Sequence, residues 1–342
     1  SADSKKTTLL NYCNVEGLIK KDGEIMGLNF TDLINSKKYQ IKSKVVINAT
    51  GVFAEEIIRM DQPKIEKMIQ PSQGVHIVLE RRFLKSKHAI LIPQTSDGRV
   101  LFAVPWKNYV VVGTTDTHVK KASEEPKALN EEIDFILKNA AKYMSVKPKR
   151  DDIKSVFAGL RPLAATSNKQ STKEVSRSHK IDISPSGLIS VLGGKWTTYR
   201  KIAEDALNTA ISINKLKKKK CKTERTKLFG FKRNVSWSDP MHVYGSMKKK
   251  VESLGGVCDN KSLSKKFYIS NNIIEWSIIH EMALTVEDIL ARRTRCVFLD
   301  SKESKRIAPV VAQKMADVLG EDDKWIDAEL KKFNKLIKNY IV

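Results

Sequence analysis

Residues 8–51 alternate between apolar and polar side chains, and a period of two is typical of strands with one buried face. Turn-forming residues interrupt this alternation at Gly17, Asp22-Gly23 and Asn35-Ser36. A continuous apolar run, 45–47, then ends in small residues and glycine, and a helical pattern follows through Ala54, Ile57 and Ile58. Residues 8–51 are therefore predicted to form a small antiparallel meander that returns to a buried strand.

Short strands separated by tight turns are predicted next, at 74–79, 89–93, 100–104 and 109–114. Such short connections make neighbouring strands antiparallel. One helix interrupts the strands: its apolar face runs from Ile133 to Met144, and Asn130 is available as its N-cap. Strand character resumes later in the chain, at 153–157, 180–183 and 188–192.

The last of these strands breaks on Gly193-Gly194 and passes directly into an amphipathic helix, whose apolar residues recur from Tyr199 to Ile211. The first turn of a helix offers unpaired N–H groups and the positive end of the dipole to an anion or an electron-rich ring edge. Glycine lets such a ligand reach the backbone because it has no Cβ. The segment indicates either a ligand-binding turn or a tight connection.

The chain changes character after this helix. Residues 215–236 are polar, basic and aperiodic, which is typical of a linker. Beyond the linker the pattern is helical, and Thr285 with Asp288 forms a capping-box signature. Apolar stripes predict two later helices, at 307–319 and 328–341.

Length and composition predict a globular chain with two or more domains, since the 342 residues are 41% hydrophobic and 30% charged. The sequence contains no uninterrupted apolar run of about 18 residues, so no membrane-spanning helix is predicted. The cysteines are scattered without a Cys-x-x-Cys pair, at Cys13, Cys221, Cys258 and Cys296. This scattered spacing predicts that the cysteines are reduced thiols in an intracellular protein. The spacing of the histidines suggests no metal site.

The net charge of +23 comes partly from two lysine blocks, 215–222 and 248–250. These blocks are solvated loops in one interpretation. In a second, they are attracted to anionic lipid headgroups, at about 1 kcal/mol per basic residue near the surface. Nucleic-acid binding is not expected, because the aromatic residues are not interleaved with the basic runs and no helix-turn-helix or RNA-recognition signature is present.

Three side chains are candidates for chemistry. Arg161 lies between apolar neighbours in Gly159–Leu163, where a charge is costly unless an anion or a structural salt bridge meets it. Lys195 follows the Gly-Gly turn, and a surface lysine is the alternative interpretation. His76 stands on a strand between two apolar residues, where a histidine is more often structural.

Five motifs together resemble those of the FAD-dependent glycerol-3-phosphate dehydrogenases, within the D-amino-acid-oxidase-like flavoprotein class. They are Lys44–Gly51, Gln73–Val78, Gly113–Asp116, Gly159–Leu163 and Val191–Arg200. The resemblance runs in the family's order from about Leu9 to about Tyr340, and residues 281–294 are similar to the family's C-terminal domain.

The resemblance implies an α+β fold with FAD as cofactor. Residues 1–58 and 187–214 are expected to form a partial FAD-binding Rossmann-like domain, and 59–186 an antiparallel substrate-binding sheet. A basic linker, 215–236, leads to a C-terminal α-helical cap, 237–342. The family's N-terminal Gly-x-Gly-x-x-Gly turn does not occur in this sequence. We therefore expect the chain to be the C-terminal two-thirds of a longer enzyme, inactive alone.

The resemblance also implies residue roles. Arg161 is expected to grip the phosphate of glycerol 3-phosphate, Lys195 to contact substrate or flavin, and His76 to lie at the substrate and accept a proton. Thr115 is expected to line the substrate site, although a strand-end turn explains it equally well. The expected cofactor-binding residues are Asn48, Ala49, Thr50, Gly51, Gly193, Gly194, Lys195, Trp196 and Thr197.

The implied reaction is oxidation of sn-glycerol 3-phosphate to dihydroxyacetone phosphate, with electrons passed to a quinone. The alternatives are a glycerophosphate oxidase, an amine-oxidising relative of the same fold, and a non-catalytic fragment that binds a membrane or partner. The expected location is the cytoplasm, the cytoplasmic membrane surface or, in a eukaryote, the mitochondrial inner membrane. A homodimer is left open.

Overall fold

The computed structural model describes residues 2, 7–165, 179–214, 216–254 and 261–342, so the predictions for Lys215 and Cys258 lie outside the described residues. The chain divides into two compact units. Unit 1 comprises Ser1–Gly74, Asp116–Pro126 and Gly159–Lys227, and unit 2 comprises Val75–Thr115, Lys127–Ala158 and Leu228–Val342. Across the described part of the chain, no helix combines the length and the apolar character that crossing a bilayer requires.

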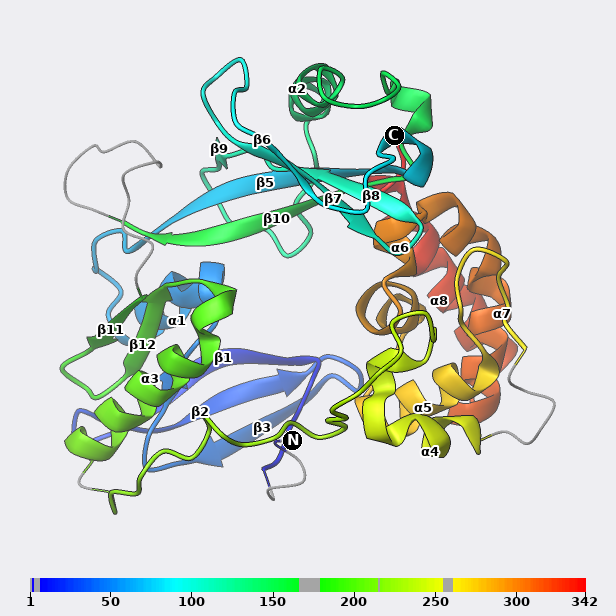
Figure 1. The fold of residues 1–342 in the computed structure, drawn as a ribbon. Coiled ribbons are helices and arrows are strands. Elements are labelled where there is room, and N and C mark those ends of the chain that lie inside the picture. The colour runs from blue at the N-terminus through cyan, green and yellow to red at the C-terminus, as the bar shows by residue number, and fades with distance from the viewer. Residues whose placement is uncertain (1, 3–6, 166–178, 215, 255–260) are drawn as a thin grey trace. The chain divides into compact units, whose positions relative to one another are not determined.

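Unit 1 contains the meander that the alternating pattern predicted. Its three antiparallel strands are β1 (Cys13–Lys21), β2 (Glu24–Asp32) and β3 (Lys37–Lys42) (Figure 1). Asp22 and Gly23 join the first two strands with φ of 52° and 84°. An Asp-Gly pair suits this two-residue turn because both central positions need positive φ.

A second sheet of unit 1 places two strands in parallel. Strand β4 (Ile47–Asn48) pairs with β12 (Ile189–Gly193), which also pairs antiparallel with β11 (His179–Ile183). Each parallel strand leads into a helix: β4 precedes η2 (Gly51–Phe53) and α1 (Ala54–Asp61), and β12 precedes η5 (Trp196–Thr198) and α3 (Tyr199–Ile213). Buried apolar residues in or directly before these strands and in α1 contribute to the small core here, among them Val46, Ile58, Leu188 and Leu192.

A buried carboxylate joins three elements of unit 1. Asp61, at the end of α1, lies 2.6 Å from Lys20 Nζ of β1 and accepts a 2.6 Å hydrogen bond from Ser186 Oγ in the β11–β12 turn. Burial alone would raise the pKa of Asp61, but hydrogen bonds from Lys20, Ser184 and Ser186 outweigh it and hold that pKa below its usual value. The charged form therefore ties the meander to the second sheet.

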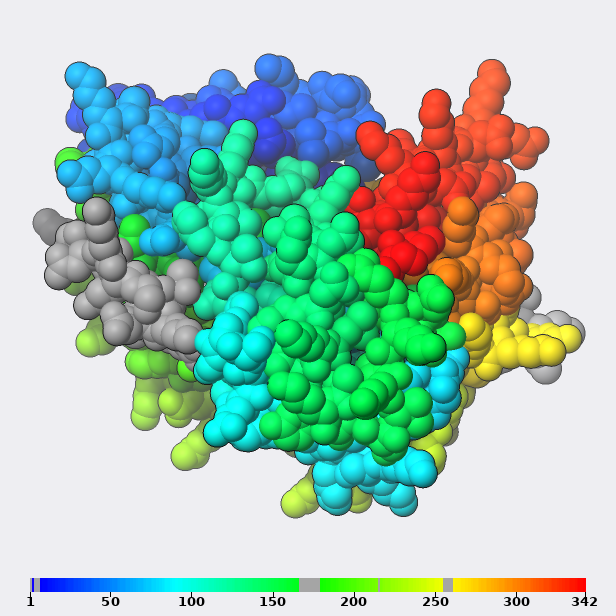
Figure 2. Space-filling view, turned by 90° about the horizontal axis from the view of Figure 1, so that it is seen from above, coloured from blue at the N-terminus to red at the C-terminus, as the bar shows by residue number. Residues whose placement is uncertain are grey.

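The large antiparallel sheet has the order β10-β5-β8-β7-β6, with β9 also paired to β5. Its strands are β5 (Ile69–Glu80), β6 (Ile90–Ile92), β7 (Leu101–Trp106), β8 (Tyr109–Gly113), β9 (Thr117–His118) and β10 (Ser155–Ala164). Helix α2 (Asn130–Ala140) packs against β7 and β8 and contributes to the outer surface of unit 2 (Figure 2). Short 3-10 turns, η3 (Arg81–Phe83) and η4 (Arg150–Asp152), end β5 and precede β10.

Two expectations for α2 are wrong. Its N-cap is Leu129 rather than Asn130, and the helix ends at Ala140, before Met144. Leu129 can occupy this position because the Glu132 carboxylate reaches back and accepts its N–H at 2.9 Å. The Asn130 side chain instead accepts a hydrogen bond from Arg150.

The C-terminal part of unit 2 is helical, as the apolar stripes predicted. Its elements are η6 (His242–Met247), α4 (Lys248–Glu252), α5 (Asn271–Glu281), the π-helix η7 (Asp288–Arg293), α6 (Cys296–Leu299), α7 (Ser301–Leu319), α8 (Asp323–Leu336) and η8 (Ile337–Asn339). The predicted capping box is present, because Asp288 N–H donates to Thr285 Oγ1 and Thr285 N–H donates to Asp288 Oδ2.

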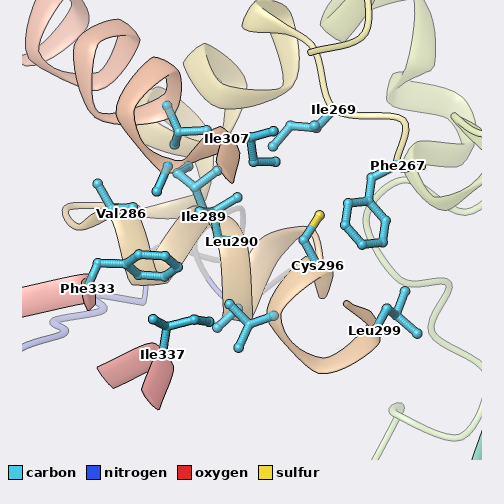
Figure 3. Packing of buried hydrophobic residues seen from close by; sticks show 14 of the residues in the cluster. Phe267, Ile269, Val286, Ile289, Leu290, Cys296, Leu299, Ile307, Phe333 and Ile337 are labelled. Atoms are coloured by element: carbon cyan, nitrogen blue, oxygen red, sulfur yellow. The ribbon is translucent and has the colours of Figure 1, made fainter. Parts of the chain in front are cut away.

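Figure 3 shows the apolar core of these helices, where Leu290, Ile307 and Phe333 come together from η7, α7 and α8. Cys296 lies in the same core, and burial raises the pKa of its thiol to about 11. It is therefore an unreactive packing residue. Cys13, Cys221 and Cys296 are all free thiols, as the sequence predicted for them.

Candidate functional site

Two glycine turns lie side by side at the carboxyl ends of the parallel strands of unit 1. The strand register pairs Ile189 with Ile47 and Ser190 with Asn48. Beyond it, Gly51 has φ of 62°, and Gly193 and Gly194 have φ of 67° and 87°. Gly194 favours glycine because of its positive φ, and a Cβ there would also stand 2.8 Å from Ile202 Cδ1, the end of a side chain that can shift.

Asn48 holds the first of these turns in shape. Its buried amide donates to Ala54 O at 2.9 Å and to Ser190 Oγ at 3.2 Å, which links the two parallel strands. Its Oδ1 accepts the Thr50 hydroxyl at 2.8 Å and the Thr50 N–H at 3.3 Å. The Asn48 side chain is thus directed at the protein, whereas Ala49 and Thr50 are exposed.

The helices that follow the turns begin without side-chain caps. No side chain caps α1 at Phe53 or α3 at Thr198 among the residues described. The second turn continues into an exposed segment, 195–199, in which Trp196 is 86% exposed and stacks on Tyr199 with ring centroids 5.6 Å apart. Both turns therefore present backbone N–H groups at the same edge of the sheet.

Arg161, also in unit 1, has an acidic neighbour. It lies on β10, and its guanidinium is 3.6 Å from Asp116 Oδ1, the oxygen that also accepts the Ser72 hydroxyl. The side chain of Arg161 is 37% exposed. The structure therefore contains the salt bridge that the sequence allowed, on an arginine that keeps access to solvent.

His76 lies in unit 2, on β5 opposite Gly113 of β8. Its half-buried ring stacks on Phe157, with centroids 5.2 Å apart and planes inclined by 15°. A Cβ on Gly113 would stand 2.8 Å from both His76 Cγ and Val75 O. Gly113 on one strand and Phe157 on another thus define where this ring can lie.

Thr115, in the same unit, is 1% exposed. Its hydroxyl accepts the Val75 N–H at 3.0 Å and donates to Glu132 Oε1 at 2.8 Å. Sequence reasoning missed Glu132, because the capping signature looks for Ser, Thr, Asp or Asn at the N-cap and this helix has Leu129 there. A substrate contact by Thr115 stays a prediction.

The predicted site residues fall into two groups. The cofactor-binding residues, with Arg161 and Lys195, belong to unit 1, and the paired strands β4 and β12 bring the two glycine turns together. His76 and Thr115 belong to unit 2, where the Thr115 hydroxyl accepts the N–H of Val75, the residue before His76.

Comparison with known proteins gives the class. Residues 1–200 match the FAD-dependent oxidoreductase family, and residues 189–326 match the C-terminal domain of alpha-glycerophosphate oxidase. The chain therefore belongs to the FAD-dependent oxidoreductases, and the flavoprotein resemblance and the α+β fold class predicted from its motifs are confirmed.

Individual relatives of this chain carry the name glycerol-3-phosphate dehydrogenase. The chain is 32% identical over 359 residues to mitochondrial glycerol-3-phosphate dehydrogenase of Bos taurus, a match to 96% of this chain and 49% of the relative. It is 33% identical over 366 residues to a probable enzyme of that name in Dictyostelium discoideum, covering 97% of this chain and 57% of the relative. The chain thus spans about half the length of the curated relatives it matches.

A solved structure is similar over the whole chain. The glycerol-3-phosphate dehydrogenase from Bacillus halodurans complexed with FAD has a TM-score of 0.80 and 25% identity, covering 100% of this chain and 71% of that one.

The residues of unit 1 fit the family's cofactor. Adjacent parallel strands end in glycine turns before helix N-termini, which is the arrangement that receives dinucleotides. A Cβ on Gly51 would meet nothing within 4 Å, so the backbone there is open to close approach.

Proposed function

We propose that the protein oxidises sn-glycerol 3-phosphate to dihydroxyacetone phosphate with FAD as cofactor. One observation carries the substrate assignment: relatives that match 96% of the chain are named glycerol-3-phosphate dehydrogenase. Arg161 supports it, because a partly exposed guanidinium suits a phosphate dianion. This assignment also favours the dehydrogenase over an amine-oxidising relative.

The proposed division of labour follows from the chemistry. Arg161 binds two phosphate oxygens, and Lys195 adds a point charge to substrate or flavin. His76 accepts the hydroxyl proton as the carbinol carbon loses its hydride and the C=O bond forms. FAD, when bound, supplies the hydride acceptor. Trp196, Thr197 and the turn at Gly193-Gly194 would lie at the flavin, and Asn48–Gly51 would lie near its adenosine and pyrophosphate half.

The electron acceptor is proposed to be a quinone, with oxygen as the alternative. The decisive experiment mixes the FAD-loaded, full-length gene product with sn-glycerol 3-phosphate without oxygen and follows the flavin's visible absorbance. We expect the flavin to bleach with this substrate and not with glycerol, and to recover its colour with a soluble quinone. Absence of bleaching would remove the proposed substrate, whereas rapid recovery with oxygen and formation of peroxide would indicate an oxidase.

We also propose peripheral attachment to an anionic membrane, at the mitochondrial inner membrane if the source is eukaryotic. Basic and apolar side chains are both exposed along the linker and just after it. The exposed lysines are Lys217, Lys218, Lys219, Lys220 and Lys222. Leu228 and Trp237 are 62% and 81% exposed. Exposed lysines suit attraction to anionic headgroups, and an exposed tryptophan suits a position among headgroups. A homodimer stays a prediction.

Changing these five lysines to glutamine is expected to abolish most binding to vesicles that contain an anionic phospholipid. Binding of the unchanged protein should fall steeply with salt, because the screening length shortens from about 10 Å at 0.1 M to about 3 Å at 1 M. Cosedimentation measures both effects. The matched control changes the same number of exposed lysines near α8, namely Lys324, Lys331, Lys332, Lys335 and Lys338. If both variants lose the same amount of vesicle binding, the attraction depends on the net charge of the protein and not on the linker.

A further inference from the structure

The pairing of β5 changes register next to His76. His76 pairs with Gly113 of β8, whereas Gln73 pairs with Thr117 of β9. Between these pairs β5 has two residues and the opposite chain has three, Thr114 to Asp116. This one-residue excess, here called the bulge, interrupts the ladder and, like a β-bulge, can re-aim the side chains beside it.

The bulge is held by a buried hydroxyl and a buried carboxylate of unit 2. Thr115 is 1% exposed and Glu132 is 5% exposed. The Thr115 hydroxyl accepts the N–H of Val75, the residue before His76, and donates to Glu132 Oε1. The other oxygen, Oε2, accepts the Leu129 N–H at the start of α2. The helix therefore fixes the carboxylate, the carboxylate orients the hydroxyl, and the hydroxyl holds the peptide that carries His76.

We propose that Thr115 and Glu132 are positioning residues that act through His76. The proposal rests on the proposed function for His76 as the proton acceptor. Its consequence is specific. If the hydroxyl orients the histidine, its loss should slow turnover and leave substrate affinity unchanged; a substrate-binding threonine would do the reverse.

The test compares Thr115→Val with Thr115→Ser. Valine keeps the shape but removes both hydrogen bonds, whereas serine keeps them. We expect Thr115→Val to lower kcat by roughly tenfold or more while KM stays within about twofold, since small misplacements of catalytic groups cost about that much. Thr115→Ser should restore most of kcat. Glu132→Gln keeps the size of the side chain but weakens the acceptor, so its kcat should lie between those of the two threonine variants. It replaces Thr115→Val in the test if the valine variant does not fold.

A second readout needs no turnover. The ring signal of His76 is identified among the six histidines by its loss in His76→Gln, using protein labelled in the histidine rings. Because this ring stacks on Phe157, its chemical shift reports small movements. We expect Thr115→Val to move this signal and Thr115→Ser to leave it in place. Asp322→Ala is the matched control, since it removes a helix-capping carboxylate that accepts the Trp325 N–H at 3.0 Å in the same unit.

The two readouts separate the two proposals. An unmoved His76 signal in folded Thr115→Val, or a rise in KM with unchanged kcat, would overturn the positioning role. A moved signal in a protein that does not oxidise glycerol 3-phosphate would keep the positioning role and overturn the proposed function. A signal that moves equally in Asp322→Ala would show a general loss of order and also count against the proposal.

Discussion

Replacing Arg161 with alanine is expected to lower kcat/KM for sn-glycerol 3-phosphate by on the order of thirtyfold or more, because losing a charge-assisted contact costs about 2 kcal/mol or more. Most of the loss should appear in KM, since the phosphate is bound both before and during hydride transfer. Arg161→Lys should recover only part, because an ammonium cannot make a planar two-oxygen contact. Steady-state kinetics on the FAD-loaded, full-length gene product measures these effects.

Arg59→Ala is the matched control for this experiment. Arg59 belongs to the same unit, pairs with Glu55 at 2.7 Å, and is 41% exposed, close to the 37% of Arg161. Its loss should leave kinetics unchanged, since an exposed ion pair contributes little. If Arg161→Ala keeps both its kinetics and its discrimination against glycerol, the Arg161–Asp116 pair is structural and the phosphate site lies elsewhere.

Sequence patterns predicted the parts of this fold that depend on neighbouring residues. The meander followed from a two-residue period and an Asp-Gly turn whose positive φ values are local requirements. The break at Gly193-Gly194 and the helix after it followed for the same reason. The family motifs supplied the candidate residues, because motif spacing is visible along the chain.

The contacts that give those candidates their surroundings were not predictable, because they join distant parts of the chain. Thr115 meets Glu132 from α2, and Arg161 meets Asp116 from the segment after β8. The ring of His76 stacks on Phe157, which lies 81 positions later. No period or turn rule relates such positions, so partners of this kind come only from the fold.

Gly113→Ala is expected to disturb His76 more than any change at the surface of the sheet. The new Cβ would lie 2.8 Å from the His76 ring at Cγ and 2.8 Å from the backbone oxygen of Val75. The ring is held on Phe157 and the oxygen belongs to a buried strand, so neither can move without cost. Overpacking of this kind should reduce the free energy of unfolding by about 1–3 kcal/mol. It should also lower kcat, and urea unfolding together with steady-state kinetics measures the two effects.

Gly159→Ala separates crowding at the ring from the general effect of adding a methyl group to a strand. Gly159 is an exposed residue of β10, and a Cβ there would meet nothing within 4 Å. This variant should unfold at the same urea concentration as the unchanged protein or a slightly higher one, because alanine lowers the entropy of the unfolded chain. If Gly113→Ala is equally stable and equally active, the His76 ring has room to move and its position between Gly113 and Phe157 does not determine turnover. If Gly113→Ala is destabilised but keeps its kcat, the close approach at Gly113 serves packing alone, and the proton is accepted by another group.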